Sequence, residues 1–267
     1  MKQEKAENLV RIQKVISQVG IASRRQAEKM ILEGRVTLNG KKVSELGTKI
    51  NPEADHLKID GKLVKLENKQ KVYIALNKPR GCITTSLDEE NRPTIYHFLE
   101  KKVRERVFPI GRLDCNSEGL LLLTNDGDMC EFLTRPKNSI ERVYEVKIQG
   151  TIDKEVIARL NKGVRLDDGW FSKPKIKFLK KMEENCWVEV SLRSGKNREV
   201  RRIFNSLGYN VLKLKRIMFA AIELGSLKTG DFRYLTLREI NSLKKLARRK
   251  PENVSKEFRG QRIQRVR

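Results

Sequence analysis

Short apolar stretches between turn residues occupy the first 66 residues of the chain. Apolar side chains recur at helical spacing between residues 15 and 19, and Gly20, a common helix end, follows them. Residues 23–26 (Ser-Arg-Arg-Gln) match a capping box, which marks the start of a second helix. Asn39-Gly40 and Asp60-Gly61 each lie between short β-prone segments, as in two-residue hairpins. The pattern predicts a small unit of two helices and two hairpins.

The pattern changes beyond residue 71, where longer apolar runs mix irregularly with helical stretches. We expect strands at residues 72–76, 107–110, 120–123, 141–148, 176–179, 187–192, 211–214 and 220–224. We expect helices at 94–99, after the capping residues Asp126 and Asp153, at 198–207, and after a capping box at 236–239. Strands outnumber helices and do not alternate with them, so the expected fold class is α+β, built on a mixed sheet.

The net charge narrows the choice of partner. The chain carries 58 Lys and Arg against 34 Asp and Glu, a formal charge of +24. A surplus of this size repels itself in the compact state unless a polyanion offsets it, which makes nucleic acid the first candidate. A membrane is the second, but no segment approaches the roughly 18 apolar residues that span a bilayer. The first eight residues show neither a secretory nor an organellar presequence, so we expect a soluble, cytoplasmic protein.

Together these patterns divide the chain into domains. Residues 9–67 are expected to form a small α/β domain, and residues 71–243 a larger mixed-sheet domain with helices, after a short polar linker. The last residues, 244–267, are basic and poorly patterned. Such a tail is either disordered until it meets RNA or simply solvated, and both interpretations stay open.

Cysteine and histidine are too scattered for a metal centre. They stand at Cys82, Cys115, Cys130, Cys186, His56 and His97, with no paired spacing. A structural zinc site needs clustered ligands, so we expect free thiols in a reducing compartment and no metal. No glycine-rich phosphate loop or dinucleotide fingerprint is present either, so we expect chemistry without a cofactor.

The best candidate for chemistry is the segment 111–126. Arg112 and Asp114 stand two positions apart, before a turn-rich Asn-Ser-Glu-Gly stretch and a run of four leucines. A bounded apolar run of this length indicates a buried strand, which holds the charged loop rigidly at the surface. The plain alternative is a loop with an exposed ion pair, the usual position for charged residues.

The first domain carries its cations at unusual places. Arg24 and Arg25 occupy the first helical turn after Ser23, where a positive charge opposes the helix dipole. Two such choices in a row indicate a negatively charged partner, although solvated arginines are the simple alternative. With Ile-Ala-Ser-Arg-Arg-Gln-Ala at 21–27 and Gly-Arg-Val-Thr-Leu-Asn-Gly at 34–40, the domain resembles the RNA-binding module of ribosomal protein S-four type. The resemblance implies that RNA phosphates are gripped by Arg11, Lys14, Arg24 and Arg25.

Four motifs of the second domain stand in a telling order. They are Lys-Pro-Arg-Gly at 78–81, Gly-Arg-Leu-Asp at 111–114 with its leucine run, Tyr144, and Gly-Lys-Asn-Arg-Glu-Val-Arg-Arg at 195–202. In this order they resemble the motifs of bacterial ribosomal-RNA pseudouridine synthases, in the subfamily that modifies small- and large-subunit RNA and carries the same amino-terminal module. The resemblance departs at Glu199, where glutamine is expected, and a carboxylate there is expected to compete for Arg201.

The resemblance implies an enzyme that detaches uracil from its ribose and rejoins it through C5. This isomerisation demands no cofactor. By resemblance, Asp114 is the nucleophile, Arg201 its ion-pair partner, and Tyr144 the ring that stacks on the base. The target base must flip out of the RNA helix. The implied RNA-binding residues of this domain are Lys78, Arg80, Arg112, Lys196 and Arg198.

The implied substrate is ribosomal RNA, free or in an assembling subunit, and we expect a monomeric enzyme. The basic tail and residues 91–94 (Asn-Arg-Pro-Thr) favour large-subunit RNA. Two alternatives stay open: a non-catalytic RNA-binding or ribosome-assembly protein on the same fold, and a synthase acting on small-subunit RNA or transfer RNA. Whether Asp114 attacks the base or the sugar is open as well.

Overall fold

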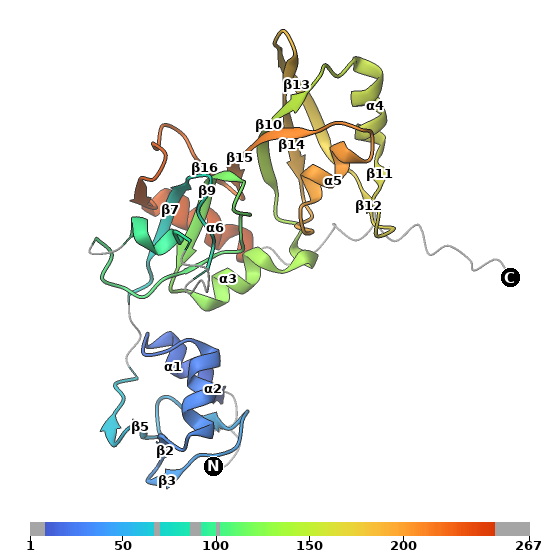
Figure 1. Ribbon diagram of the computed structural model, residues 1–267. Coiled ribbons are helices and arrows are strands. Elements are labelled where there is room, and N and C mark those ends of the chain that lie inside the picture. Colours follow the sequence, from blue (N-terminus) through green and yellow to red (C-terminus); the bar gives the residue numbers. More distant parts are fainter. Residues whose placement is uncertain (1–8, 67–69, 86–91, 100–101, 249–267) are drawn as a thin grey trace, which may run out of the picture. The chain divides into compact units, whose positions relative to one another are not determined.

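The protein divides into two compact units, Met1–Val72 and Tyr73–Arg267. Figure 1 shows the computed structural model, which describes residues 9–66, 70–85, 92–99 and 102–248. The break falls just after the polar segment that the sequence predicts to be a linker. Most of the predicted basic tail, residues 249–267, lies outside the described residues.

The first unit combines two helices with short strands. Its elements are β1 (Val10–Arg11), α1 (Ile12–Gln18), α2 (Arg24–Leu32), β2 (Val36–Leu38), β3 (Lys41–Lys42), β4 (Lys49–Ile50), β5 (Leu57–Ile59) and β6 (Lys62–Leu63). Four strands form an antiparallel sheet in the order β3-β2-β5-β6, and β1 pairs with β4. Buried residues such as Ile12, Ile31 and Leu57 join the helices and strands in one core.

The local signals of this unit are confirmed. The amide of Gln26 donates to Ser23 Oγ (3.2 Å) and the amide of Ser23 donates to Gln26 Oε1 (3.1 Å), which completes the capping box. Asn39 and Asp60 adopt the left-handed conformation ahead of a glycine at the two hairpin turns. That conformation suits the twist of paired strands, so a few neighbouring residues determine both turns. The pattern does not predict the β1–β4 pair, because each strand has only two residues.

The second unit contains the larger sheet. Its elements are β7 (Tyr73–Lys78), the 3₁₀ helix η2 (Ile95–Phe98), β8 (Phe108–Pro109), β9 (Glu118–Thr124), α3 (Gly127–Thr134), the 3₁₀ helix η3 (Pro136–Asn138), β10 (Arg142–Gln149), α4 (Lys154–Lys162), β11 (Val164–Arg165), β12 (Phe171–Ser172), β13 (Lys175–Lys181), β14 (Asn185–Leu192), α5 (Glu199–Asn205), β15 (Val211–Phe219), β16 (Ile222–Glu223), β17 (Phe232–Tyr234) and α6 (Leu237–Arg248). The main path of the sheet is β13-β14-β10-β15-β9-β7-β17. In the described part of the chain, no helix is long and apolar enough to cross a membrane.

The sheet is mixed, which confirms the predicted α+β class. Strands β9 and β15 run parallel, whereas β10 pairs antiparallel with both β14 and β15. The parallel register places Gly119 beside Arg216. A Cβ on Gly119 would lie 2.3 Å from the Arg216 carbonyl oxygen, and φ at Gly119 is +102°. Only glycine allows this close approach of the two backbones.

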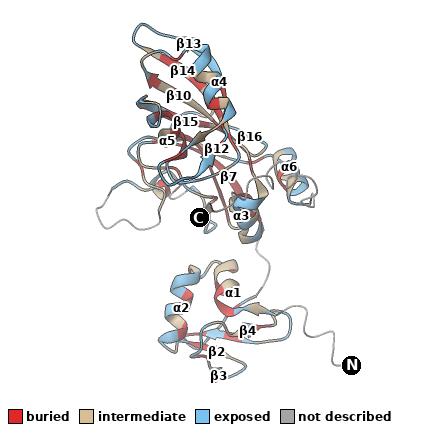
Figure 2. Cartoon of the chain, turned by 90° about the vertical axis from the view of Figure 1, so that its right-hand side faces the viewer, coloured by how far each residue is buried: buried red, intermediate tan, exposed pale blue. Residues whose placement is uncertain are grey.

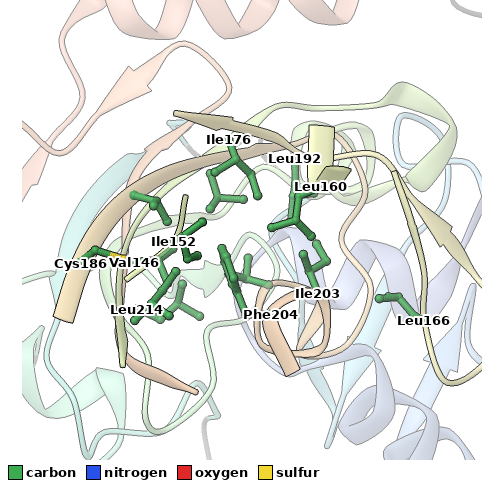
Figure 3. Close-up of a cluster of buried hydrophobic side chains, with 14 residues drawn as sticks. Val146, Ile152, Leu160, Leu166, Ile176, Cys186, Leu192, Ile203, Phe204 and Leu214 are labelled. Atoms are coloured by element: carbon green, nitrogen blue, oxygen red, sulfur yellow. The ribbon is translucent and has the colours of Figure 1, made fainter. Parts of the chain in front are cut away.

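The parallel pair also separates two hydrophobic cores. Helices α4 and α5 pack against β10, β13, β14 and β15 around residues such as Leu160, Phe204 and Leu192 (Figure 3). Helices α3 and α6 pack against β7 and β9 around Leu133 and Leu243. Figure 2 shows buried positions along β10 and β14, with the outer side of α4 exposed. Loops at the junction of β9 and β15 therefore lie between the two hydrophobic cores.

Several features of the second unit differ from the expected pattern, the unpredicted strand β17 among them. Strand β15 continues to Phe219, well past residue 214. The short hairpin of β11 and β12 is not predicted. Helix α6 continues to Arg248, so residues 244–248 are helical and do not belong to a tail. The extension of β15 gains its pairs from β10, far away in sequence, and the strands of the β11–β12 hairpin have only two residues each, so local patterning registers neither.

Candidate active site

Hydrogen bonds to five consecutive main-chain carbonyls hold the loop that carries Asp114. Residues 113–117 are here called the aspartate loop. The main-chain carbonyl of each of them accepts a hydrogen bond. The donors are Thr84 Oγ1 to Leu113 (2.8 Å), the Ser117 amide and Lys78 Nζ to Asp114 (3.0 and 3.1 Å), the Gly81 amide to Cys115 (2.9 Å), Arg201 Nη2 to Asn116 (3.1 Å) and Lys78 Nζ to Ser117 (2.8 Å). A loop bonded at every carbonyl has little freedom, so its main chain positions Asp114 without using the side chain.

Lys78, at the end of β7, is central to this arrangement. It is 0% exposed, and its third hydrogen bond goes to Pro79 O (3.0 Å). An ammonium has three protons, and here all three are donated to carbonyls. Burial lowers the pKa of Lys78. The predicted contact of Lys78 with RNA is therefore wrong, because neither a proton nor exposed surface is left for a phosphate.

The carboxylate of Asp114 stays open. Asp114 is half-buried, and within the described residues its hydrogen bonds all use the main chain. Lys78 and Arg201 both interact electrostatically with Asp114, and Arg80 with Arg201. A carboxylate whose lone pairs are not used by the protein is available as a nucleophile, and the nearby cations stabilise its charge.

Arg201 faces the same loop but does not form the predicted ion pair. Its Nη1 donates to Val211 O (3.0 Å) and its Nη2 to Asn116 O, while its Nε is buried without a partner in the described part of the chain. Burial and the neighbouring Arg198 lower the pKa of Arg201, and Asp114 acts in the opposite direction. Arg201 is thus close enough to Asp114 to influence it, but its hydrogen bonds go to carbonyls instead of the carboxylate.

Tyr144 lies beside a buried arginine. It is half-buried on β10 and pairs across the strands with Arg216 of β15. Arg216 is 3% exposed, its Nε donates to Leu120 O (2.7 Å), and its Nη2 has no hydrogen-bond partner among the described residues. Burial lowers the pKa of Arg216, and Tyr144 opposes that shift. Arg216 therefore connects the strand of Tyr144 with the strand that follows the aspartate loop.

Arg142 is a second arginine near Tyr144, and with Arg216 it adds positive charge there. The guanidinium carbons of Arg142 and Arg216 each lie 5.0 Å from the centre of the Phe219 ring. Burial lowers the pKa of Arg142, which donates to Ser194 O (3.2 Å). Neither arginine is among the predicted site residues. The signal was present in the alternation that places Leu214 and Arg216 two apart, but an expected strand end at residue 214 concealed it.

Glu199, the departure from the expected motif, has a structural role. It is 4% exposed; its Oε1 accepts from Ser172 Oγ (2.8 Å) and Ser194 Oγ (2.6 Å), and its Oε2 from the Lys196 amide (3.2 Å). No bond joins Glu199 to Arg201 among the described residues. The competition for Arg201 that the sequence suggested is absent there, because the carboxylate is fully engaged on the other side of α5.

The other predicted RNA-binding residues of this unit are exposed. They are Arg80, Arg112, Lys196 and Arg198. Arg198 adopts the left-handed conformation (φ 48°) directly before α5, which costs a non-glycine residue on the order of 1 kcal/mol. Lys196 Nζ lies 4.4 Å from the centre of the Trp170 ring. Their contact with RNA stays a prediction.

The cations predicted for the first unit lie on its two helices. Arg11 directly precedes α1, and Arg24 and Arg25 are the first residues of α2; all three are exposed. Lys14 is half-buried within α1. No acidic residue stands in the first turn of either helix, so no acidic side chain of that turn offsets the positive end of the helix dipole.

The thiols show no paired chemistry. None of the four cysteines, all of which lie in the described part of the chain, forms a disulfide bond. Burial raises the pKa of Cys82 and Cys186, which favours the unreactive protonated form. Among the residues that the structure describes, no group of three or more His, Cys, Asp or Glu side chains is arranged to hold a metal ion.

Comparison with known families finds two matches along the chain. Residues 72–206 match the model of RNA pseudouridylate synthases, and residues 10–56 match the S4 domain. The first match contains Asp114, Tyr144 and Arg201, and the second contains the two helices with their exposed arginines.

Individual proteins resemble the chain over most of its length. "Ribosomal large subunit pseudouridine synthase B" of Bacillus subtilis is 42% identical over 89% of this chain and 96% of its own. An uncharacterized RNA pseudouridine synthase of Aquifex aeolicus is 42% identical over 88% of this chain and 93% of its own. A crystal structure of a pseudouridylate synthase superposes with a TM-score of 0.61 at 30% identity, covering 88% of this chain and 99% of that one.

Proposed function

The chain belongs to the RNA pseudouridylate synthase family, and we propose that it isomerises a specific uridine of large-subunit ribosomal RNA with Asp114 as nucleophile. The name of the Bacillus subtilis relative supports the choice of the large subunit. The single observation that carries the role of Asp114 is the aspartate loop, whose five bonded carbonyls present one open carboxylate. The proposal includes a monomeric, cytoplasmic enzyme whose domains extend over residues 9–67 and from residue 71 to the end of α6 at Arg248.

The reaction needs no co-reactant. The bond between N1 of uracil and C1′ of ribose breaks, and a bond between C5 and C1′ forms. One proton leaves C5 and one is gained at N1, so substrate and product are isomers. The carboxylate of Asp114 adds covalently, either to the sugar or to the base, and is expelled again when the new bond has formed.

The surroundings of Asp114 suit this role. A covalent nucleophile must be held at the reacting atom, and the aspartate loop supplies that position through main-chain bonds. The cations Lys78 and Arg201 stabilise the charge of the carboxylate before attack and after expulsion. Both bind carbonyls of the loop, so they keep their place when the carboxylate becomes a neutral ester.

Tyr144 is the proposed stacking partner of the uracil ring, and its hydroxyl assists removal of the proton from C5. Arg216, buried between β9 and β10 on β15, fixes the distance between Tyr144 and the aspartate loop. Its Nη2 is buried and has no hydrogen-bond partner among the described residues, so this end of the guanidinium is not offset by an acceptor there.

RNA binding is assigned to the exposed cations. Arg11, Lys14, Arg24 and Arg25 hold structured RNA through its phosphates, as positioning contacts without a reaction. Arg80 and Arg112 flank the aspartate loop, and we assign them to holding the strand from which the uridine is flipped.

The decisive experiment compares Asp114→Asn with Asp231→Asn, which changes an exposed aspartate outside the site. Purified proteins are incubated with large-subunit, small-subunit and transfer RNA transcripts, and pseudouridine is mapped. The normal and Asp231→Asn proteins are expected to modify one uridine of the large-subunit transcript. Asp114→Asn is expected to bind the RNA but give no product, since the loop is held by its main chain. In the same assay Arg112→Ala lowers the single-turnover rate.

Three outcomes contradict parts of the proposal. An unaltered pseudouridine pattern with Asp114→Asn overturns the nucleophile, whereas binding without product by the normal protein favours a protein that only binds RNA. Modification of the small-subunit or transfer RNA transcript in place of the large-subunit one overturns the substrate but leaves the chemistry.

A further inference from the structure

The hairpin of β11 and β12 presents an aromatic surface that the proposed reaction does not use. Trp170 is 41% exposed and Phe171 is 49% exposed. The Phe171 ring packs against the backbone of Gly163, where an added Cβ would lie 2.2 Å from the ring. Phe171 thus closes the base of the hairpin, whereas the indole of Trp170 touches Lys196, whose Nζ lies 4.4 Å from the ring centre.

The turn that carries Trp170 is internally bonded. The Leu166 amide donates to Trp170 O (2.8 Å), the Gly169 amide to Leu166 O (2.9 Å), and the Trp170 amide to Asp168 Oδ1 (3.0 Å). Leu166 is buried in the core shared with α5, as Figure 3 shows. The backbone is therefore satisfied and anchored, which leaves the indole face as the free part of the turn.

Two residues of α5, the buried Glu199 and the arginine Arg202, bind this hairpin. Glu199 accepts from Ser172 of β12 and also from the loop that carries Lys196. Arg202 pairs with both Asp167 and Asp168 of the turn. These ion pairs raise the pKa of Arg202 and offset part of the negative charge of the two acids that precede Trp170 in the turn.

Helix α5 lies beside β12 of the hairpin (Figure 1), and one of its side chains also reaches the aspartate loop. Arg201 reaches back to Asn116 in the aspartate loop, and the next residue, Arg202, reaches the turn before Trp170. Neighbouring residues of a helix point about 100° apart, so the two loops flank the same short helix. Helix α5 is therefore the structural link between the loop of Asp114 and the turn of Trp170.

We propose that Trp170 and Lys196 form a stacking platform for an unpaired base of the substrate RNA next to the target uridine. This inference rests on the proposed function. An exposed, rigidly held indole with a lysine beside it matches how proteins bind single-stranded RNA, where bases stack on aromatic rings and cations bind the backbone. Exposed cations around the hairpin favour RNA over a protein partner: Arg165, Lys173, Lys196 and Arg198.

A fluorescence experiment tests direct contact. The chain has two tryptophans, and Trp187 on β14 is also near a lysine, with Lys180 Nζ 5.9 Å from its ring centre. Trp187→Phe leaves Trp170 as the reporter, and Trp170→Phe leaves Trp187 as the matched control. A single-stranded RNA of about ten nucleotides is titrated into each. Quenching is expected in the Trp187→Phe protein and not in the control.

The kinetic test uses the large-subunit transcript that the enzyme modifies. Trp170→Ala is expected to raise KM about ten-fold, the loss of one stacked base, with kcat changed less than about two-fold. Trp170→Phe restores most of the affinity, because a smaller ring still stacks. Replacing the neighbouring nucleotide by an abasic one raises KM of the normal enzyme and adds nothing to Trp170→Ala.

The outcomes separate this inference from the proposed function. Absence of quenching together with an unchanged KM for Trp170→Ala overturns the platform. So does equal quenching of both tryptophans, which indicates nonspecific binding. If Asp114→Asn keeps full activity but quenching of Trp170 persists, the nucleophile is wrong and the platform stands.

Discussion

Two loops that flank α5 are held by buried charges of opposite sign. The aspartate loop is held by the buried cation Lys78 and presents a carboxylate. The segment 194–198, here called the lysine loop, is held by the buried anion Glu199 and presents Lys196 and Arg198. In each loop the charge that faces outward is opposite to the charge that holds it.

The difference lies in what each buried charge binds. Lys78 donates only to main-chain carbonyls of two short segments, so it makes one loop rigid. Glu199 accepts from Ser172 of β12 as well as from the lysine loop, so it connects two elements. Neither depends on a counter-ion: dipoles of carbonyls, hydroxyls and an amide replace the water that burial removes. A nucleophile needs a fixed position, while a binding surface needs its parts kept together.

The largest expected effect is at Lys78. Lys78→Met keeps an unbranched side chain, shorter by one heavy atom, but removes three donors and leaves buried carbonyls unpaired. We expect the free energy of unfolding to fall by about 4 kcal/mol, with pseudouridine formation reduced about 100-fold, because the aspartate loop loses its position. Urea unfolding and single-turnover assays measure the two effects.

Lys177→Met on β13 is the matched control, since Lys177 is exposed. Its unfolding free energy is expected to stay within about 0.5 kcal/mol of normal. Equal stability of the two variants would show that the carbonyls find other donors and that Lys78 does not hold the loop.

A smaller effect is expected at Glu199. Glu199→Ala leaves the hydroxyls of Ser172 and Ser194 without their acceptor, and we expect a loss of about 2 kcal/mol of stability. RNA affinity falls with it, because the hairpin and lysine loop separate, while kcat changes little. Glu199→Gln, the residue that the family resemblance leads one to expect, still accepts from the serines and restores most of both. A large loss of kcat with normal affinity would instead place Glu199 on the side of the aspartate loop.

The smallest effect concerns an ion pair with a true counter-ion. Glu239 binds Arg233 (2.7 Å) and the Thr236 amide (2.8 Å), which lowers its pKa to about 2. Because the folded pKa lies below the unfolded value, this stabilisation is complete above about pH 4.5 and is lost as the pH falls toward about 2. Glu239→Gln is expected to remove about 1 kcal/mol at neutral pH and to flatten the pH dependence of unfolding in that window. A variant that keeps the normal acid dependence would assign it to other carboxylates.

Much of the fold was predictable from short segments. The capping boxes at Ser23 and Thr236 form, and Asp126 and Asp153 cap their helices through side-chain bonds to Met129 and Val156 amides. Such signals need only three or four neighbouring residues. The order of four motifs predicted the family, which the comparisons confirm.

The roles of individual cations were less predictable. Lys78 stands beside Arg80 in one motif, yet the first is buried and the second exposed. The side chain of Arg201 contacts the main-chain carbonyl of Asn116, 85 residues away in the aspartate loop, and not the carboxylate of Asp114. Arg216 and Trp170 were not predicted at all, because one lies on an unexpectedly long strand and the other on an unpredicted hairpin.

The sequence by itself determined the turns, the helix starts and the set of charged residues available to the site, because these depend on close neighbours. Only the tertiary structure decided which charges point inward. Whether a lysine binds carbonyls or RNA depends on strands that pair from distant parts of the chain, as β9 and β15 do around Gly119 and Arg216. Burial removes water from whichever side chain that pairing encloses, and the dipoles that replace the water are supplied by segments far away in sequence.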